Sequence, residues 1–294
     1  MKLVEPEVIK DLLSFLVEKK LDNNISSYIS IKNALYSFSI PISKVAINQG
    51  IPLFRMRVHD EIHTNLEEAL FHEIKDVGHR LDYNNIKNFG RANEPLQSIF
   101  YCSTERETAY FETSSIARFE TKNDVEIYTT SRWIIQDDIQ VATFPINELN
   151  KNRNLIAESL NKKFEESVSK LRGSGTDQYL QLIDLLSLEF ARKHHKENDY
   201  LISCAFANYL YDKYFVNGET EGKMELDGII YPSVQWTKKG MNLALKPYLI
   251  NNKTLLLDQV VCQKMERTGE QHYTQTERII SKSIDYKNGK IIWK

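Results

Sequence analysis

Strand-like runs and amphipathic helical runs alternate along this chain without a fixed rhythm. The stretches NQGIPLFRMRVHDE (48–61) and SIFYCS (98–103) have the apolar and β-branched character of strands, whereas PEVIKDLLSFLVEKK (6–20) places apolar residues at helical spacing. A strict succession of strand, helix and strand, which would predict a parallel sheet, does not run through the sequence. The pattern therefore predicts an α+β fold.

The other predicted elements follow the same two patterns. Helices are predicted around 26–38 (ending before Pro41), 64–77, 104–119, 147–200 with a break at Gly173 and Gly175, and 199–215. Strands are predicted in pairs within 125–144 and within 224–250, where Gly240 lies in the turn. The tail after residue 255 alternates weakly, which predicts an edge strand and a partly exposed end. Thr104 is the expected cap of the 104–119 helix, with Glu107 as its capping-box partner.

Composition excludes several classes of protein. The chain has 294 residues, 41% of them hydrophobic and 27% charged, and a formal net charge of −2. Without an overall positive field, neither nucleic acid nor anionic lipid is an expected direct partner. No apolar run approaches the roughly 18 residues of a transmembrane helix, and the N-terminal stretch lacks the apolar core of a signal peptide. These features predict a cytoplasmic protein with no membrane association.

Cysteine and histidine spacing argues against a metal site. The three cysteines, Cys102, Cys204 and Cys262, are far apart and form no CxxC pair, so each is expected to pack as a small apolar side chain. His59 and His63 lie four residues apart, but they follow a strand and lack a third ligand at a fixed spacing. We therefore predict no metal.

Two arginines interrupt an apolar strand pattern. Arg55 and Arg57 are two residues apart, so a regular strand points both to the same side. An inward-facing arginine needs an anion or a carboxylate, because a buried unpaired charge is costly. The alternative is an edge strand with a solvated basic face, and the sequence alone does not separate the two.

Glu112 lies near the packing side of the helix predicted at 104–119. It falls three residues after Ala109, on a helix whose other apolar positions are Tyr110 and Ile116. Such a carboxylate either forms a structural salt bridge or recognises a sugar hydroxyl and stabilises a developing cation. Ser233, after Pro232 at a strand end, is by itself a turn serine.

Taken in order, these stretches resemble a known family. The set PLFRMR, FGRANEPLQSIFYCSTERETAYFET and DGIIYPSVQWTKKGMNLALKP is similar to the RES domain family, which is named after an arginine, a glutamate and a serine in that order. The matching positions are Arg55, Gly90, Arg91, Asn93, Tyr101, Ala109, Glu112, Pro232, Ser233, Asn242 and Leu243. Where the family usually has an aromatic residue between the turn arginine and asparagine, this sequence has Ala92.

The resemblance implies a domain plan and a fold. It places a RES domain at 48–255, with a helical insertion at about 147–195, after an N-terminal helical extension at 1–47 and before a tail at 256–294. The family's fold is similar to that of ADP-ribosyltransferases: a mixed β core with surrounding helices.

The resemblance also implies an NAD-consuming toxin, with NAD as substrate and no resident cofactor. The known activities of the family are cleavage of the nicotinamide bond with phosphate or water as acceptor, and transfer of ADP-ribose to a protein. Glu112 would face the ribose whose bond breaks, Arg55 would clamp the pyrophosphate, and Tyr101 would contact the nicotinamide. These three are the expected catalytic residues.

Four further residues are the expected substrate contacts: Arg91, Asn93, Ser233 and Asn242. Arg91 would help to hold the dinucleotide or an acceptor phosphate, and Ser233 and Asn242 would hold ribose or amide groups. The family pairs with a DNA-binding, Xre-type antitoxin, which is the expected protein partner. The sequence does not decide whether the chain forms a homo-oligomer. Two alternatives stay open as well: a transferase that modifies a host protein, and a non-catalytic binding module.

Overall fold

A computed structural model shows the fold of the chain as two compact units. It describes residues 5–22, 24–38, 40, 43–59, 65–118, 124–143, 162, 165–166, 176–192, 197–216, 226–235, 240–269 and 272–293. The first unit comprises Met1–Ala46, Asp82–Ser98 and Gln140–Val234, and the second comprises Ile47–Leu81, Ile99–Ile139 and Gln235–Lys294. Each unit therefore combines segments that are far apart in the sequence.

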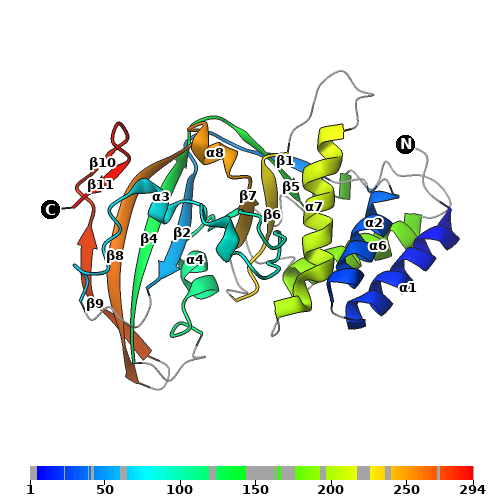
Figure 1. The fold of residues 1–294 in the computed structure, drawn as a ribbon, viewed down its shortest axis with the longest axis horizontal. Helices are drawn as coiled ribbons and strands as arrows, with labels where there is room; N and C mark the ends of the chain where they lie inside the picture. Colours follow the sequence, from blue (N-terminus) through cyan, green and yellow to red (C-terminus); the bar gives the residue numbers. More distant parts are fainter. Residues whose placement is uncertain are drawn as a thin grey trace. The chain divides into compact units, whose positions relative to one another are not determined.

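Helices dominate the first unit. Its helical elements are α1 (Pro6–Asp22), α2 (Ile25–Tyr36), η1 (Tyr83–Asn85), α6 (Thr176–Ala191), η2 (Glu197–Tyr200) and α7 (Leu201–Val216), and its strands are β1 (Ser43–Ile47), β5 (Ile139–Thr143) and β6 (Gly228–Pro232) (Figure 1). Helix α1 packs on α2, α6 and α7, and α2 packs on α7. Strands β5 and β6 pair in parallel. The predicted N-terminal helices are confirmed, and their fully buried side chains include Leu16, Ile31 and Leu35.

Strands dominate the second unit. They are β2 (Pro52–Val58), β3 (Phe100–Ser103), β4 (Val125–Ile135), β7 (Met241–Leu245), β8 (Leu255–Gly269), β9 (His272–Ile280), β10 (Ser283–Asp285) and β11 (Lys290–Ile292), with helices α3 (Ile74–Val77), α4 (Arg106–Thr113) and α8 (Tyr248–Asn251). Six strands follow the order β7-β3-β2-β4-β8-β9 and pair in antiparallel fashion. Parallel and antiparallel pairing together with helices confirm the predicted α+β class.

The helix predicted at 64–77 is wrong for most of its length. Of its described residues, 65–77, only the four of α3 are helical, and a distant strand pairs with the two residues that precede α3. The amide of Ile291 donates to the carbonyl of His72 at 2.9 Å, and Glu73 forms a bridge with Lys290. Non-local pairing of this kind overrides a local helical pattern.

The C-terminal tail also differs from the prediction of a single edge strand. Strand β8 is fifteen residues long and lies between β4 and β9, so it is internal to its sheet. Strand β9 takes the edge position, and β10 and β11 pair as a separate antiparallel ribbon. Pairing partners decide which strand is internal, and weak alternation along one strand does not identify them.

The predicted capping box of α4 is wrong. The N-cap residue is Glu105, and it makes no side-chain capping hydrogen bond. Thr104 instead extends towards β7, where its amide donates to the carbonyl of Met241 at 3.0 Å. The break at Gly173 and Gly175 lies outside the described residues.

Candidate active site around Glu112

Helix α4 places Glu112 against strands of the second unit. The helix packs on β2, β3 and β7. Its buried residues Ala109 and Tyr110 belong to an apolar cluster with Met56 and Tyr128. Glu112 lies in the last turn and is half-buried. Apolar packing of the middle of the helix thus fixes where its carboxylate lies.

Amide donors hold the Glu112 carboxylate. The Asn242 Nδ2 donates to Glu112 Oε1 at 2.9 Å, and the amide of Gln235 lies 3.4 Å from the same oxygen. Asn242 is itself oriented, because its Oδ1 accepts a hydrogen bond from Ser103 Oγ at 2.7 Å. Ser103 and Asn242 are directly opposite on β3 and β7, and both are buried. The carboxylate is therefore held by a chain of neutral hydrogen bonds whose members have little freedom.

Arg118 stabilises the turn that carries Glu112. Its Nη1 donates to the carbonyls of Phe111 and Glu112, at 3.1 and 3.0 Å. These carbonyls belong to the last turn of α4, where backbone acceptors lack partners within the helix and a cation is favourable. Neither Arg118 nor Ser103 was predicted from the sequence, because each acts through a contact that only the fold creates.

Gly240 permits the close approach that brings β7 to α4. A Cβ atom placed on Gly240 would lie 1.8 Å from Oγ1 and 2.6 Å from Cβ of Thr108, which is fully buried in α4. Contacts this short cannot be relieved by rotating the threonine, since its Cβ is fixed to the helix backbone. Gly240 therefore determines how closely Asn242 can approach Glu112.

We expect Gly240→Ala to separate α4 from β7 and to lower the free energy of unfolding by about 1–3 kcal/mol, the usual cost of overpacking. Denaturant unfolding measures this loss. The double variant Gly240→Ala/Thr108→Ser removes the Cγ2 atom and should recover part of it. Gly289→Ala is a control of a different kind. A Cβ atom there has open space, so the substitution tests the strain of a φ of +67° without a steric clash. Unchanged stability in Gly240→Ala would contradict the close packing.

Arg55 occupies an internal strand and contacts β3. Strand β2 lies between β3 and β4, so the alternative of a solvated edge strand is wrong. The Nη1 of Arg55 donates to the carbonyl of Tyr101 at 2.8 Å, and its guanidinium lies 5.5 Å from the centre of the Phe100 ring. Its Nε is buried without a hydrogen-bond partner in the described structure. Burial, and then repulsion from Arg57, lower the pKa of Arg55. A cation in this environment is suited to an anionic ligand.

The structure does not bring Arg55 and Glu112 into one hydrogen-bonded group. Along β2, Phe54 and Met56 pack with the cluster that contains α4, so strand alternation points Arg55 to the other side. Strands β2 and β3 pair at a single position, Phe54 with Ser103. The Arg55 side chain contacts the β3 backbone two residues earlier, at the Tyr101 carbonyl. Tyr101 itself is half-buried on β3.

Arg91 has extensive contacts within the first unit. Its guanidinium donates to the carbonyls of Phe190 and Arg192, at the end of α6, and lies 5.4 Å from the centre of the Tyr200 ring. An arginine in this position satisfies the last carbonyls of a helix. The neighbouring Ala92 and Asn93 are buried, as is Ser233 just after β6. Arg91 therefore has a structural role in addition to any contact with a substrate.

A scan of family descriptions finds the RES domain over residues 53–250, which is more than half of the chain. The chain belongs to the RES domain family. Members of this family are toxin-type enzymes. No curated protein and no solved structure matches the chain.

The RES domain match contains all seven predicted site residues. It begins within β2, just before Arg55, and ends within α8, after Asn242. Helices α1 and α2 and strands β8 to β11 lie outside the match. Among the described residues, none of the helices is long and apolar enough to cross a membrane.

The described part of this RES protein contains no group of three histidine, cysteine or acidic side chains placed to hold a metal ion. His59 has a packing role: its Nε2 lies 2.7 Å from Thr129 Oγ1, and its ring is tilted by 31° against that of Phe71, with ring centres 4.7 Å apart. His63 lies outside the described residues. All three cysteines are buried and free, as predicted, and burial raises the pKa of Cys102 and Cys204.

Proposed function

We propose that this RES protein cleaves NAD at the bond between nicotinamide and ribose and thereby acts as a bacterial toxin. The observation that carries the proposal is the Glu112 carboxylate, which neutral donors from Asn242 and Gln235 hold at the end of α4. These amide donors orient the carboxylate oxygens and add no opposite charge of their own. The negative charge of the carboxylate is well suited to stabilise a cation that develops during a reaction.

The proposed reaction breaks the bond between the ribose C1′ and the nicotinamide nitrogen. Its electron pair leaves with the nicotinamide, whose ring loses its positive charge. The ribose carbon then carries an oxocarbenium-like charge, which Glu112 stabilises while it accepts hydrogen bonds from the ribose hydroxyls. An oxygen of water or phosphate attacks this carbon and forms ADP-ribose or its 1-phosphate. The proton of the attacking group passes to solvent.

Arg55 supplies the proposed contact for the pyrophosphate. A phosphate oxygen would offer its guanidinium the anionic partner that the described structure does not provide at Nε. Guanidinium groups bind phosphates through paired hydrogen bonds, which also fix orientation. Tyr101, whose carbonyl holds Arg55, is the proposed contact for the nicotinamide. The buried polar residues Asn93, Ser233 and Asn242, together with Arg91, are proposed to contact the rest of the substrate.

Two features of the proposal come from the family. A toxin of this kind acts on the NAD of its own cell, so an Xre-type antitoxin is the proposed partner that suppresses it. The acceptor is water, phosphate or a protein side chain, because all three approach the same ribose carbon. Transfer of ADP-ribose to a host protein is therefore the alternative outcome of the same site.

The decisive experiment incubates purified protein with NAD, with and without inorganic phosphate, and separates the products by chromatography. We expect free nicotinamide in both cases if water is the acceptor, and only with phosphate if phosphate is. ADP-ribose or its 1-phosphate identifies which acceptor is used. NAD that stays intact under both conditions, but is consumed when cell extract is added, would favour the protein-modifying transferase. Intact NAD in all three conditions would contradict the proposal.

A further inference from the structure

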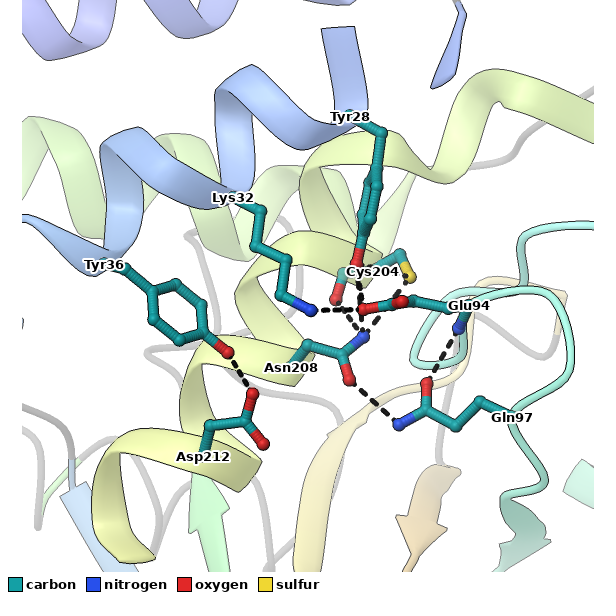
Figure 2. A network of polar contacts seen from close by, with 8 residues as sticks. All are labelled: Tyr28, Lys32, Tyr36, Glu94, Gln97, Cys204, Asn208 and Asp212. Carbon is teal, nitrogen blue, oxygen red and sulfur yellow. Dashed lines mark hydrogen bonds and ion pairs between the residues drawn. The ribbon is translucent and has the colours of Figure 1, made fainter. Parts of the chain in front are cut away.

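Helix α2 holds the turn that carries Arg91 and Asn93 from both ends. The ring of the buried Tyr28 packs on Phe89 with ring centres 4.6 Å apart. Its hydroxyl donates to Glu94 Oε1 at 2.6 Å (Figure 2). Phe89 directly precedes Gly90, and Glu94 directly follows Asn93. One side chain of α2 therefore contacts the residues on either side of the turn.

A polar network extends this attachment to two helices. Lys32 of α2 forms an ion pair with Glu94 at 2.5 Å, in which the two side chains are 29% and 31% exposed. The Glu94 amide donates to Gln97 Oε1 at 2.8 Å, and Gln97 Nε2 donates to Asn208 Oδ1 of α7 at 2.9 Å. Figure 2 shows the side chains of α2, the turn and α7 meeting at Glu94 and Asn208. The partly buried ion pair keeps more of its strength than one in open solvent.

The turn is ordered internally as well. The Gly90 amide donates to the carbonyl of Asn93 at 2.9 Å, which closes the turn, and the Leu96 amide donates to the carbonyl of Ile86 at 2.7 Å. The Asn93 Nδ2 donates to the carbonyl of Glu94 at 3.0 Å. The position of Asn93 is thus tied to Glu94, and through Glu94 to α2.

The hydroxyl of Tyr28 remains a donor at any ordinary pH. Burial, and then the neighbouring Cys204 and Glu94, raise the pKa of Tyr28. The same hydroxyl oxygen also accepts a hydrogen bond from Asn208 Nδ2, at 3.5 Å. The Tyr28 hydroxyl therefore keeps the proton that it donates to Glu94.

We infer that α2 is a positioning element for substrate binding, in which Tyr28, Lys32 and Glu94 hold the turn so that Arg91 and Asn93 meet NAD in a fixed geometry. The inference rests on the proposed function, because it requires these two residues to contact the substrate. It assigns a role to a helix that lies outside the RES domain match. A preorganised binding turn lowers the entropy cost of substrate binding, so its loss should raise KM for NAD more than it lowers kcat.

The test compares Tyr28→Phe and Glu94→Gln with Tyr36→Phe. Tyr36 lies on the same helix and its hydroxyl also donates to a carboxylate, but that carboxylate is Asp212 of α7 (Figure 2). Tyr36→Phe therefore removes a similar hydrogen bond between helices without touching the turn. We expect KM for NAD to rise about tenfold in the first two variants, with kcat changed less than about twofold, and both constants unchanged in Tyr36→Phe. Glu94→Asp keeps the carboxylate on a side chain that is one methylene shorter, so it serves as the partial-rescue variant and should recover part of the rise in KM seen in Glu94→Gln.

Hydrogen exchange of the 86–98 segment gives a second readout that does not depend on turnover. We expect the amides of Gly90 and Leu96 to exchange about tenfold faster in Tyr28→Phe and Glu94→Gln, but not in Tyr36→Phe. Unchanged exchange, or faster exchange with an unchanged KM, would overturn the positioning role. Wild-type protein that releases no nicotinamide would instead overturn the proposed function. In that case unchanged exchange at Gly90 and Leu96 still rejects the ordering of the turn, and faster exchange still supports it.

Discussion

Replacement of Glu112 by glutamine is expected to reduce the release of nicotinamide from NAD by about 100- to 1,000-fold. Glutamine fits the space of the carboxylate but carries no charge to stabilise the ribose cation. It also turns an amide group towards Asn242 Nδ2 and the Gln235 amide, which both donate to the native carboxylate. The rate of nicotinamide release at saturating NAD measures the effect.

A matched control is available on the same helix. Glu107 lies in the first turn of α4 and is exposed, so Glu107→Gln makes the same chemical change away from Asn242. We expect Glu107→Gln to retain turnover within about twofold, as surface substitutions usually change little. Circular dichroism should show that both variants are folded. Full turnover in a folded Glu112→Gln variant would contradict the assignment of Glu112 as the catalytic carboxylate.

Replacement of Arg55 by methionine is expected to weaken NAD binding by about 10- to 100-fold, which is the usual worth of one charge-assisted hydrogen-bonded contact. Methionine retains much of the arginine stem and removes the cation. Isothermal titration with NAD, and with pyrophosphate as a fragment, measures the loss. Pyrophosphate binding should fall with NAD binding if Arg55 contacts the phosphates.

The same variant should show an opposite effect on the free protein. Burial lowers the pKa of Arg55 and its Nε has no partner in the described structure, so the charge opposes folding in the absence of a ligand. Without NAD, the Tm of Arg55→Met should therefore equal or exceed that of the wild type, while a given concentration of NAD should raise the Tm of the wild type more than that of the variant. Arg132→Met is the control, because Arg132 is exposed and pairs with Asp258. Normal NAD binding by Arg55→Met would place the pyrophosphate contact elsewhere, with Arg91 as the next residue to test.

Local patterns in the sequence were sufficient for several elements. The apolar spacing of 6–20 predicted α1, and the alternation around Arg55 predicted β2. These elements obey their local periodicity because each packs one face or one stripe. The helix predicted at 64–77 failed because Ile291 and Lys290, more than two hundred residues along the chain, pair with its middle. No window of local sequence contains that information.

In the candidate site, too, the sequence predicted one part and the fold decided the other. The order of Arg55, Glu112 and Ser233 was readable, and it led to the family that the comparison confirmed. The partners of these residues were not readable, because they come from distant segments. Asn242 is 130 residues from Glu112, and the carbonyl of Phe190 is 99 residues from Arg91. The prediction for Arg91 accordingly omitted its contacts at the end of α6.

The sequence by itself determined the α+β class, the two N-terminal helices and the order of the RES residues, because composition, periodicity and short motifs are local properties. Only the tertiary structure decided that Glu112 is held by Asn242 and Gln235, and that Arg55 lies on an internal strand against the Tyr101 carbonyl. It alone showed that Tyr28 of α2 contacts Phe89 and Glu94, at the two ends of the turn that contains Arg91. Hydrogen-bond partners and burial depend on which segments the fold brings together, and chain folding sets that juxtaposition through contacts spread over the whole sequence.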